Sequence, residues 1–162
     1  MPISVPFVPT PPEVVRKTLE IAGLKSGEVL LDMGCGDGRV LVIGAREFGA
    51  KAVGIETRSD LVLEAALNAK KAGVKDDILI VQGDFFKINV SFADVVFLYL
   101  LSSVNERLRP KLEAELRKGV RVVSHDFEVR GWKPKAKYSV RDSHREHQVY
   151  LYVVGECSHE EE

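Results

Sequence analysis

The sequence has few of the residues that build disulfide frameworks, metal centres or membrane spans. Cys35 and Cys157 are the only cysteines, and Cys35 lies inside a glycine-rich turn, so we expect neither a disulfide framework nor a metal site. No apolar run approaches the roughly 20 residues of a transmembrane helix. The first residues, MPISVPFVPTPP, lack the basic start and apolar stretch of a signal peptide. These absences predict a cytoplasmic protein without contact to a membrane.

Asparagine, glutamine and methionine are also scarce, whereas 29% of the residues are charged. This bias is reported for hyperthermophile proteins and favours a thermophilic source, with chance in a short chain as the alternative. The formal net charge is −1. A protein that binds mainly by neutralising phosphates is therefore not expected, so nucleic acid is an unlikely partner, although a local basic patch stays possible.

The order of apolar runs and amphipathic stretches predicts an α/β fold. The strands are near-continuous runs of Val, Ile and Leu, which indicates burial on both faces of a parallel sheet. We expect a doubly wound, mostly parallel seven-stranded sheet with an antiparallel hairpin at one edge. Strands are predicted at residues 28–33, 51–56, 77–82, 93–100, 120–127, 136–142 and 147–155, and helices after Thr10 and at 39–50, 59–73 and 103–119.

A chain of 162 residues forms one domain with a real core. We expect this domain to span residues 1–156, with an N-terminal segment and capping helix over 1–25, and a flexible acidic tail over 157–162. At the first helix, Thr10 is predicted to cap, Pro11 to fit the first turn, and Glu13 to complete a capping box. Gly23 fits the end of that helix. Pro110 lies inside the fourth helix and is expected to restart or kink it.

The stretch LDMGCGDGRV, residues 31–40, joins the first strand to a helix through three glycines. It differs from the dinucleotide fingerprint G-x-G-x-x-G, because Arg39 occupies the position of the last glycine. Acidic residues follow successive strands and should meet at one edge of the sheet: Asp32, Asp37, Glu56 and Asp84. A pyrophosphate there would face several carboxylates, so a ligand with cationic groups is favoured.

S-adenosylmethionine fits this pattern, because it carries a sulfonium, an ammonium and one carboxylate. Backbone N–H groups of the turn can hold the carboxylate, and Asp32 can attract the ammonium. Glu56 can accept hydrogen bonds from both ribose hydroxyls. Asp84 can accept from the adenine amino group while Phe85 packs on the ring. Each of these residues also has a purely structural reading, and only their placement after successive strands makes the set informative.

The motifs LDMGCGDGR, VGIE and VQGDFF, in this order, resemble those of class I S-adenosylmethionine-dependent methyltransferases. The stretches PFVPTPPEVVRKTLEIAG, RVVSHDFEVRGW and HQVYLYVVGE are similar to the small archaeal protein lysine methyltransferases, which are related to the mitochondrial and adenine nucleotide translocase lysine methyltransferases. The resemblance implies an archaeal enzyme that methylates lysine on proteins with relaxed specificity. The expected cofactor contacts are Val8, Thr10, Asp32, Gly34, Cys35, Gly36, Asp37, Gly38, Glu56, Thr57, Asp84, Phe85 and Leu98.

The acceptor side carries a weaker signal. The stretch FLYLLSSVNERL lacks the Asn- or Asp-Pro-Pro-aromatic turn common in enzymes that methylate adenine or amide nitrogens. A lysine acceptor needs only a neutral amine opposite the sulfonium, and no general base is evident. The acceptor-pocket candidates are Phe7, Tyr99, Ser102 and Asn105, and Phe7 replaces a tyrosine that relatives often carry.

Other residues and functions stay open. His125 and Asp126 either face the cleft or end a strand, and Trp132 either contacts a protein substrate or covers the sheet edge. We expect a monomer that acts on exposed lysines of proteins. The alternatives are an RNA or small-molecule methyltransferase and a non-catalytic cofactor-binding module. A nicotinamide-dependent oxidoreductase is disfavoured by Arg39 and the acidic rim.

Overall fold

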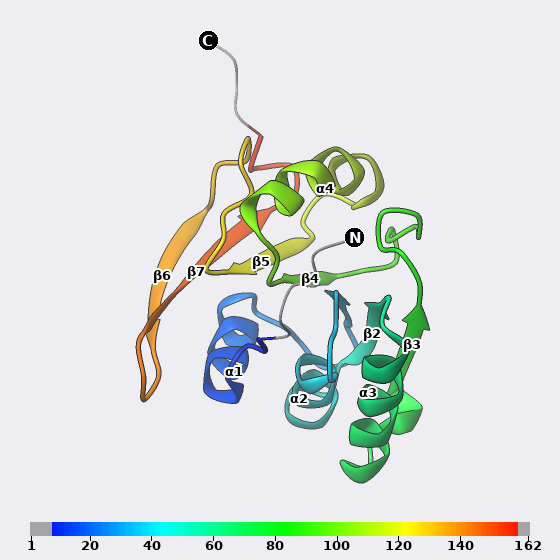
Figure 1. The fold of residues 1–162 in the computed structure, drawn as a ribbon. Helices are drawn as coiled ribbons and strands as arrows, with labels where there is room; N and C mark the ends of the chain where they lie inside the picture. Colours follow the sequence, from blue (N-terminus) through cyan, green and yellow to red (C-terminus); the bar gives the residue numbers. More distant parts are fainter. Residues whose placement is uncertain (1–7, 159–162) are drawn as a thin grey trace, which may run out of the picture.

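The computed structural model describes residues 8–158, which form a seven-stranded sheet with helices on both faces (Figure 1). The strand order is β3-β2-β1-β4-β5-β7-β6. Strand β7 is antiparallel to both of its neighbours, β5 and β6, and all other neighbouring strands are parallel. The predicted fold class, including its antiparallel edge, is confirmed. The strands are β1 Val29–Met33, β2 Lys51–Glu56, β3 Ile78–Gln82, β4 Val95–Leu98, β5 Arg121–His125, β6 Ala136–Arg141 and β7 Glu146–Val153.

The helices divide between the two faces of the sheet. Two clusters of buried apolar side chains lie on opposite faces, one with residues of α1 and α2 and one with residues of α4. Each cluster buries the apolar faces of its helices against the sheet, which is the main source of stability in such a fold. The helices are α1 Pro12–Ile21, α2 Arg39–Phe48, α3 Ser59–Lys71 and α4 Ser102–Glu115, with a short 3₁₀ turn, η1, at Lys75–Asp77.

The strand order reverses between β1 and β4, so a crevice opens beyond the carboxyl ends of these strands. The glycine-rich turn fills one side of it. Backbone N–H groups of Gly34 and Cys35 donate to the carbonyl of Ile55 at 2.9 and 3.0 Å, which fastens the turn to the end of β2. The turn then passes directly into α2, whose N-cap is Gly38 in the left-handed conformation with φ of 82°.

The start of α1 differs from the prediction. The N-cap is Pro11, and no side chain caps the helix, so the predicted capping box of Thr10 and Glu13 is wrong. The Thr10 hydroxyl is instead 2.9 Å from Nδ1 of His125, which lies 115 residues away in sequence. A buried tertiary hydrogen bond has displaced the local one. At the other end, Gly23 follows the helix with φ of 66°, as expected.

Two further expectations meet different outcomes. The fourth helix continues through Pro110 as one element without restarting. The tail was expected to begin at Cys157, but Cys157 is buried, its carbonyl accepts from Lys133 N–H at 2.6 Å, and Ser158 pairs with Trp132. The packed part of the chain therefore includes these two residues, and the rest of the expected tail lies outside the described residues.

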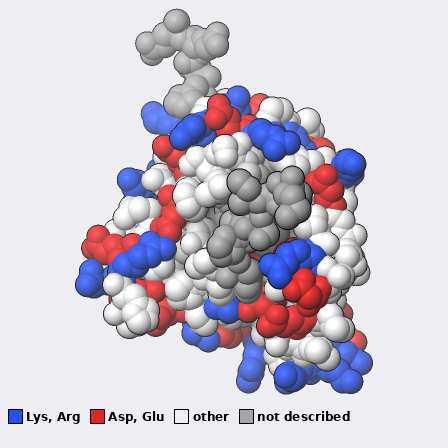
Figure 2. Space-filling view, viewed as in Figure 1, with Lys and Arg blue, Asp and Glu red and all other residues white. Residues whose placement is uncertain are grey.

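The face of the molecule seen in Figure 2 shows no dominant charge. On the face seen in Figure 2, Lys and Arg are interspersed with Asp and Glu around the outline of the molecule. None of the helices within residues 8–158 is long and apolar enough to cross a membrane.

Candidate functional site

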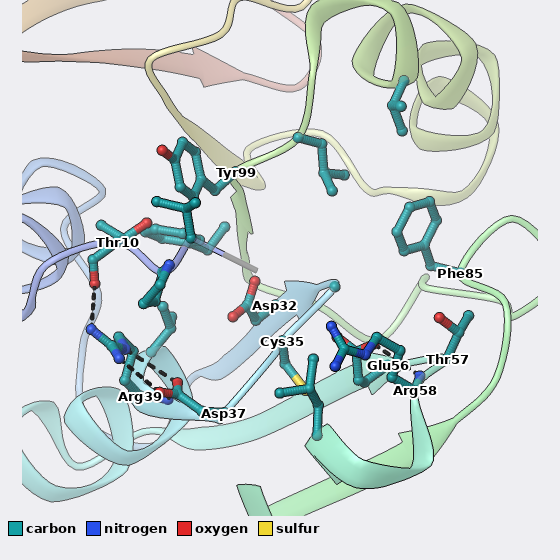
Figure 3. A pocket seen from close by; sticks show the side chains of 18 of the residues that line it. Thr10, Asp32, Cys35, Asp37, Arg39, Glu56, Thr57, Arg58, Phe85 and Tyr99 are labelled. Carbon is teal, nitrogen blue, oxygen red and sulfur yellow. Dashed lines mark hydrogen bonds and ion pairs between the residues drawn. The ribbon is translucent and has the colours of Figure 1, made fainter. Parts of the chain in front are cut away.

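A cavity of about 510 Å³ opens at the carboxyl ends of β1, β2 and β4 (Figure 3). Its wall comes from the segment before α1, the glycine-rich turn, the end of β2 and the connection from β4 to α4. This size is typical of small-molecule and cofactor sites. The residues that were predicted from sequence and line it are Val8, Thr10, Asp32, Gly34, Cys35, Asp37, Glu56, Thr57, Phe85 and Tyr99.

Asp32 lies at the floor of this cavity, near the end of β1, and is only 4% exposed. Burial raises its pKa well above the usual range, and the nearby carboxylates of Glu56 and Asp37 raise it further. A cationic group in the cavity would offset both effects and favour the ionised carboxylate. The site therefore has the electrostatic character predicted from the acids that follow the strands.

Glu56, at the end of β2, is held by backbone groups on both of its carboxylate oxygens. Oε1 accepts from Gly36 N–H at 2.9 Å and Oε2 accepts from Arg58 N–H at 3.0 Å. Each oxygen keeps a further lone pair for a ligand. Gly36 was expected to contact the cofactor, but it is not among the lining residues and its N–H is directed to Glu56. Its place in the site is to orient that carboxylate.

Arg39 is a lining residue that the sequence reasoning treated only as a mismatch. Its guanidinium contacts both carboxylate oxygens of Asp37 at 3.1 and 2.7 Å and donates to the carbonyl of Thr10 at 3.2 Å. One side chain thus joins the glycine-rich turn to the segment before α1. It also balances part of the negative charge of the rim, which a count of acidic residues alone overlooks.

The opposite wall is largely aromatic and apolar. The Tyr99 ring stacks on His125 with centroids 4.1 Å apart and lies 6.1 Å from the Phe127 ring at an interplanar angle of 28°. Burial raises the pKa of Tyr99. Phe127 was not predicted as a lining residue, because an aromatic residue just after a strand is equally typical of the hydrophobic core. The other apolar lining residues missed from sequence are Pro9, Val40, Leu61, Phe97, Leu100, Leu101 and Val104, and Arg58 was missed as well.

Three residues expected to contact the cofactor have surroundings of their own. Leu98 is fully buried in the core. The Asp84 carboxylate accepts from Phe86 N–H at 2.9 Å and closes its own turn. Gly38 lies at the start of α2, against Ala65 of α3. None of the three lines the cavity.

The acceptor-pocket candidates divide in the same way. Tyr99 lines the cavity, whereas Ser102 and Asn105 do not. Asn105 is completely buried and donates to Ser124 Oγ and to the carbonyl of Phe127, both at 3.3 Å. Its amide holds the loop that carries Phe127. Phe7 lies outside the described residues.

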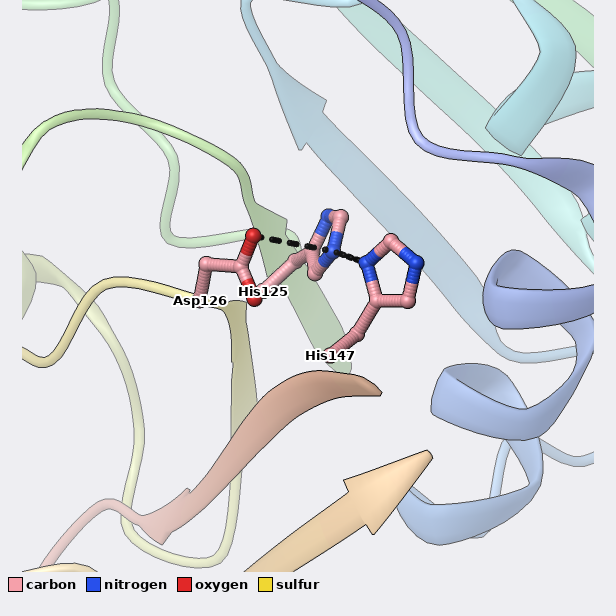
Figure 4. Close-up of side chains that lie close together, drawn as sticks. All are labelled: His125, Asp126 and His147. Carbon is pink, nitrogen blue, oxygen red and sulfur yellow. Dashed lines mark hydrogen bonds and ion pairs between the residues drawn. The ribbon is translucent and has the colours of Figure 1, made fainter. Parts of the chain in front are cut away.

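The two open cases after β5 are also resolved by burial. Trp132 is 4% exposed, packs near Tyr152 and donates from Nε1 to Glu113 at 2.7 Å, so it belongs to the core and does not present a docking surface. His125 is fully buried behind the cavity wall, with Nδ1 2.9 Å from Thr10 Oγ1 and Nε2 2.7 Å from His147 Nδ1. Figure 4 shows its ring beside that of His147.

Comparison with known proteins gives a consistent set of relatives. A model of the ANTKMT methyltransferase domain matches residues 32–136. A protein-lysine N-methyltransferase of Saccharolobus islandicus (strain REY15A) is 50% identical over 94% of this chain and 95% of its own. The adenine nucleotide translocase lysine N-methyltransferase of Mus musculus is 34% identical over 83% of this chain, which spans 58% of that relative.

A solved structure is similarly close. The crystal structure of an RNA methyltransferase from Salinibacter ruber, in complex with S-adenosyl-L-homocysteine, superposes with a TM-score of 0.85. It is 46% identical and covers 91% of this chain and 94% of its own. The two sets of relatives thus agree on the type of transfer and differ in the acceptor that their names state.

Proposed function

The chain belongs to the ANTKMT methyltransferase family of class I S-adenosylmethionine-dependent enzymes, and from that premise we propose that it methylates lysine side chains of proteins. The observation that carries the proposal is the 50% identity with a protein-lysine N-methyltransferase over nearly the full length of both chains. The cavity between the acidic edge and the aromatic wall supports it, because a cationic cofactor and an alkylamine both fit such surroundings.

The residues of the cavity suit S-adenosylmethionine. The cofactor supplies a methyl group on a positively charged sulfur. Asp32 is a buried carboxyl whose ionised form a cation would favour. Glu56 is held by two backbone N–H groups and keeps lone pairs that could accept from the hydroxyls of a ribose. Thr57 and Phe85 lie beyond Glu56 (Figure 3), where a nucleoside would extend. We therefore assign Asp32, Glu56, Thr57 and Phe85 to cofactor binding.

Methyl transfer to lysine requires a neutral amine that lies opposite the methyl group. Tyr99 and Phe127 form a wall beside which the apolar part of a lysine side chain can pack. Burial of the ammonium in this cavity, next to a sulfonium, lowers its pKa and releases the proton before transfer. Alignment between the wall and the cofactor then supplies much of the rate.

The acceptors are exposed lysines of several different proteins. All helices and strands of residues 8–158 belong to the single sheet and its covering layers, so the described part of the chain contains no separate substrate domain. An open cleft on a small body suits broad specificity, and the protein acts as a monomer. A cytoplasmic location and a thermophilic archaeal source complete the proposal, the latter supported by the Saccharolobus relative.

RNA is the second candidate acceptor, favoured by the printed name of the Salinibacter structure. The charge distribution disfavours it. The net charge is −1, and the face in Figure 2 shows basic and acidic side chains interspersed. Proteins that bind a nucleic acid backbone concentrate Lys and Arg along the contact.

One labelling experiment separates these acceptors. The purified protein is incubated with host-cell extract and S-adenosylmethionine that carries a radioactive methyl group, and the product is divided between protease and nuclease. Label that is lost to protease and mapped to lysine by mass spectrometry supports the proposal, and label on several unrelated proteins supports broad specificity. Label lost to nuclease moves the function to RNA. Glu56→Gln should label weakly, and Glu64→Gln, at an exposed position of α3, serves as the matched control.

A further inference from the structure

Behind the cavity wall, four polar side chains form a continuous hydrogen-bonded row. Thr10 Oγ1 is 2.9 Å from His125 Nδ1, His125 Nε2 is 2.7 Å from His147 Nδ1, and His147 Nε2 is 2.8 Å from Asp142 Oδ2. The row leads from a lining residue of the cavity to the β6–β7 turn. Thr10, His125 and His147 are at most 3% exposed, so water does not compete for these bonds.

Asp142 fixes the direction of every bond in this row. Its Oδ1 accepts from the backbone N–H groups of His144 and Arg145, both at 2.8 Å, and these bonds hold its pKa far below the usual range. An ionised carboxylate can only accept. His147 must therefore donate from Nε2. An imidazole that carries one proton and donates it from one nitrogen accepts at the other, so His147 accepts at Nδ1 the proton that His125 donates from Nε2.

Thr10 is the last group in the row, and the direction of its hydrogen bond follows from the others. His125 donates from Nε2 to His147, so its Nδ1 is an acceptor and the Thr10 hydroxyl donates its single proton to it. Burial lowers the pKa of His125 to about 4, with Asp126 nearby opposing this effect. His125 is then neutral under ordinary conditions. The Thr10 oxygen keeps its lone pairs and has no proton left for a ligand.

The backbone is strained at Asp126, the residue that follows His125. Asp126 has φ of 63°, the only positive φ at a non-glycine residue in the described part of the chain. Its carboxylate pairs with Arg145 at 2.6 Å, and it exchanges hydrogen bonds with the backbone of Gln148 at 2.7 and 3.0 Å. Strain of this kind persists only where its surroundings enforce it, and it is concentrated at functional sites.

A metal ion is a weaker explanation for the cluster of His125, Asp126 and His147 in Figure 4. The two facing nitrogens are 2.7 Å apart. Two nitrogens bound to one zinc ion at about 2.0–2.1 Å in tetrahedral geometry would lie over roughly 3 Å apart. The Asp126 carboxylate is also occupied by the guanidinium of Arg145. The geometry is that of a shared proton.

We propose that Asp142, His147 and His125 are positioning residues that keep the Thr10 hydroxyl a hydrogen-bond acceptor toward the cavity, so that Thr10 binds a protonated amino group. Two ligands bring such a group: the amino-acid part of the cofactor and the incoming lysine. Only the second source rests on the proposed lysine methylation, and the test distinguishes the two.

The decisive variant is Asp142→Asn. The asparagine oxygen can keep the bonds from His144 and Arg145, whereas its amide donates to His147 Nε2 and reverses every bond in the row. The Thr10 proton then faces the cavity and repels an ammonium. The same replacement in a catalytic Ser-His-Asp triad leaves the geometry intact but imposes the wrong tautomer. Asp76→Asn, at an exposed position of η1, is the matched control.

Binding is measured by calorimetry at pH 8 with S-adenosylhomocysteine and with 5′-methylthioadenosine, which lacks the amino-acid part. If Thr10 binds the cofactor, Asp142→Asn weakens S-adenosylhomocysteine binding by about tenfold or more and leaves methylthioadenosine unchanged. If Thr10 binds the acceptor, both affinities are unchanged and KM for a lysine substrate rises. The calorimetric part works even if no protein is methylated, so a failure of the proposed function does not affect it.

Thr10→Val supplies the second measurement and does not depend on the folding of Asp142→Asn. It removes the hydroxyl and should reproduce the same selective loss. In the double variant the two losses should not add, because the row acts only through Thr10. The proposal is overturned if Thr10→Val binds both cofactor analogues and the lysine substrate as tightly as the unmodified protein. Additive losses in the double variant would equally overturn it, because Asp142 would then affect binding independently of Thr10.

Discussion

The Glu56 carboxylate accepts a hydrogen bond of 2.9 Å from the backbone N–H of Gly36. This bond joins the end of β2 to the glycine-rich turn after β1, two elements that are adjacent in the sheet but separated by α2 in the chain. The conformation of the turn and the orientation of the Glu56 carboxylate therefore depend on each other. A change at Glu56 alters the conformation of the turn as well as the ligand contacts of the carboxylate.

Glu56→Gln should weaken S-adenosylhomocysteine binding by at least about tenfold, the usual cost of losing a hydrogen bond to a charged group. One amide oxygen cannot replace two carboxylate oxygens, so either Gly36 or Arg58 loses its acceptor. The unfolding free energy should fall by about 1–3 kcal/mol. Calorimetry and denaturant unfolding measure the two effects, with Glu64→Gln as control. Equal affinity of Glu56→Gln and the unmodified protein would remove Glu56 from the cofactor site.

Asp32 should make the stability of the ligand-free protein depend on pH. Its pKa in the folded protein is raised by burial and by Glu56 and Asp37, so the folded state retains a proton that the unfolded state releases. The contribution to stability is fully present below the unfolded pKa of about 3.9 and is lost as the pH rises through the folded pKa. Thermal unfolding between pH 4 and pH 8 measures this slope.

Asp32→Asn separates the effect of this carboxyl on the stability of the ligand-free protein from its effect on cofactor binding. The variant cannot ionise, so in the absence of ligand its melting temperature should be higher than that of the unmodified protein at pH 8 and should fall less as the pH rises. Its affinity for S-adenosylmethionine should be lower, because the partner of a cation is gone. A variant that binds the cofactor normally would show that Asp32 has only a structural role.

The path of the chain and the acidic edge of the site could be predicted from the sequence for a simple reason. Buried parallel strands are continuous apolar runs, and the residues after them meet at one edge. On that argument Asp32, Asp37 and Glu56 were placed at the cavity and line it, whereas Asp84, placed there on the same argument, does not. The prediction depends on local patterns and on one rule of topology, and both apply to this chain.

Contacts between distant segments could not be predicted in this way. Thr10 carries every local signal of a helix cap, yet its hydroxyl reaches His125, 115 residues later. Asn105 is a polar residue after a strand, and only the structure shows its amide turned toward the Phe127 carbonyl. Periodicity gives the face on which a side chain lies, but it does not identify the partner that a buried polar group finds across the fold.

Arg39→Lys should loosen the segment before α1. Lysine keeps the charge but cannot contact both oxygens of Asp37 and the Thr10 carbonyl with one planar group. We expect amide hydrogen exchange around Thr10 to become about tenfold faster and cofactor affinity to fall. Arg16→Lys is the control, because Arg16 pairs with Glu47 and also joins α1 to α2, on the exposed surface. Equal exchange rates in the two variants would contradict this role of Arg39.

Gly38→Ala should destabilise the protein more than Gly23→Ala, although both glycines have positive φ. Gly38 has φ of 82° and Gly23 has φ of 66°, so the cost of the left-handed backbone, about 1–2 kcal/mol, is common to both. A Cβ at Gly38 would lie 2.9 Å from the Cβ of Ala65, whereas one at Gly23 meets no atom within 4 Å.

The difference between these two variants measures how tightly α2 packs on α3 beneath the site. Crowding of this kind costs about 1–3 kcal/mol, and denaturant unfolding resolves it. Because Gly38 is the N-cap of α2, relief of the clash must shift the glycine-rich turn, and Gly38→Ala should also weaken cofactor binding while Gly23→Ala leaves it unchanged. Equal stability and equal affinity of the two variants would mean that α3 moves aside and that the turn does not depend on this contact.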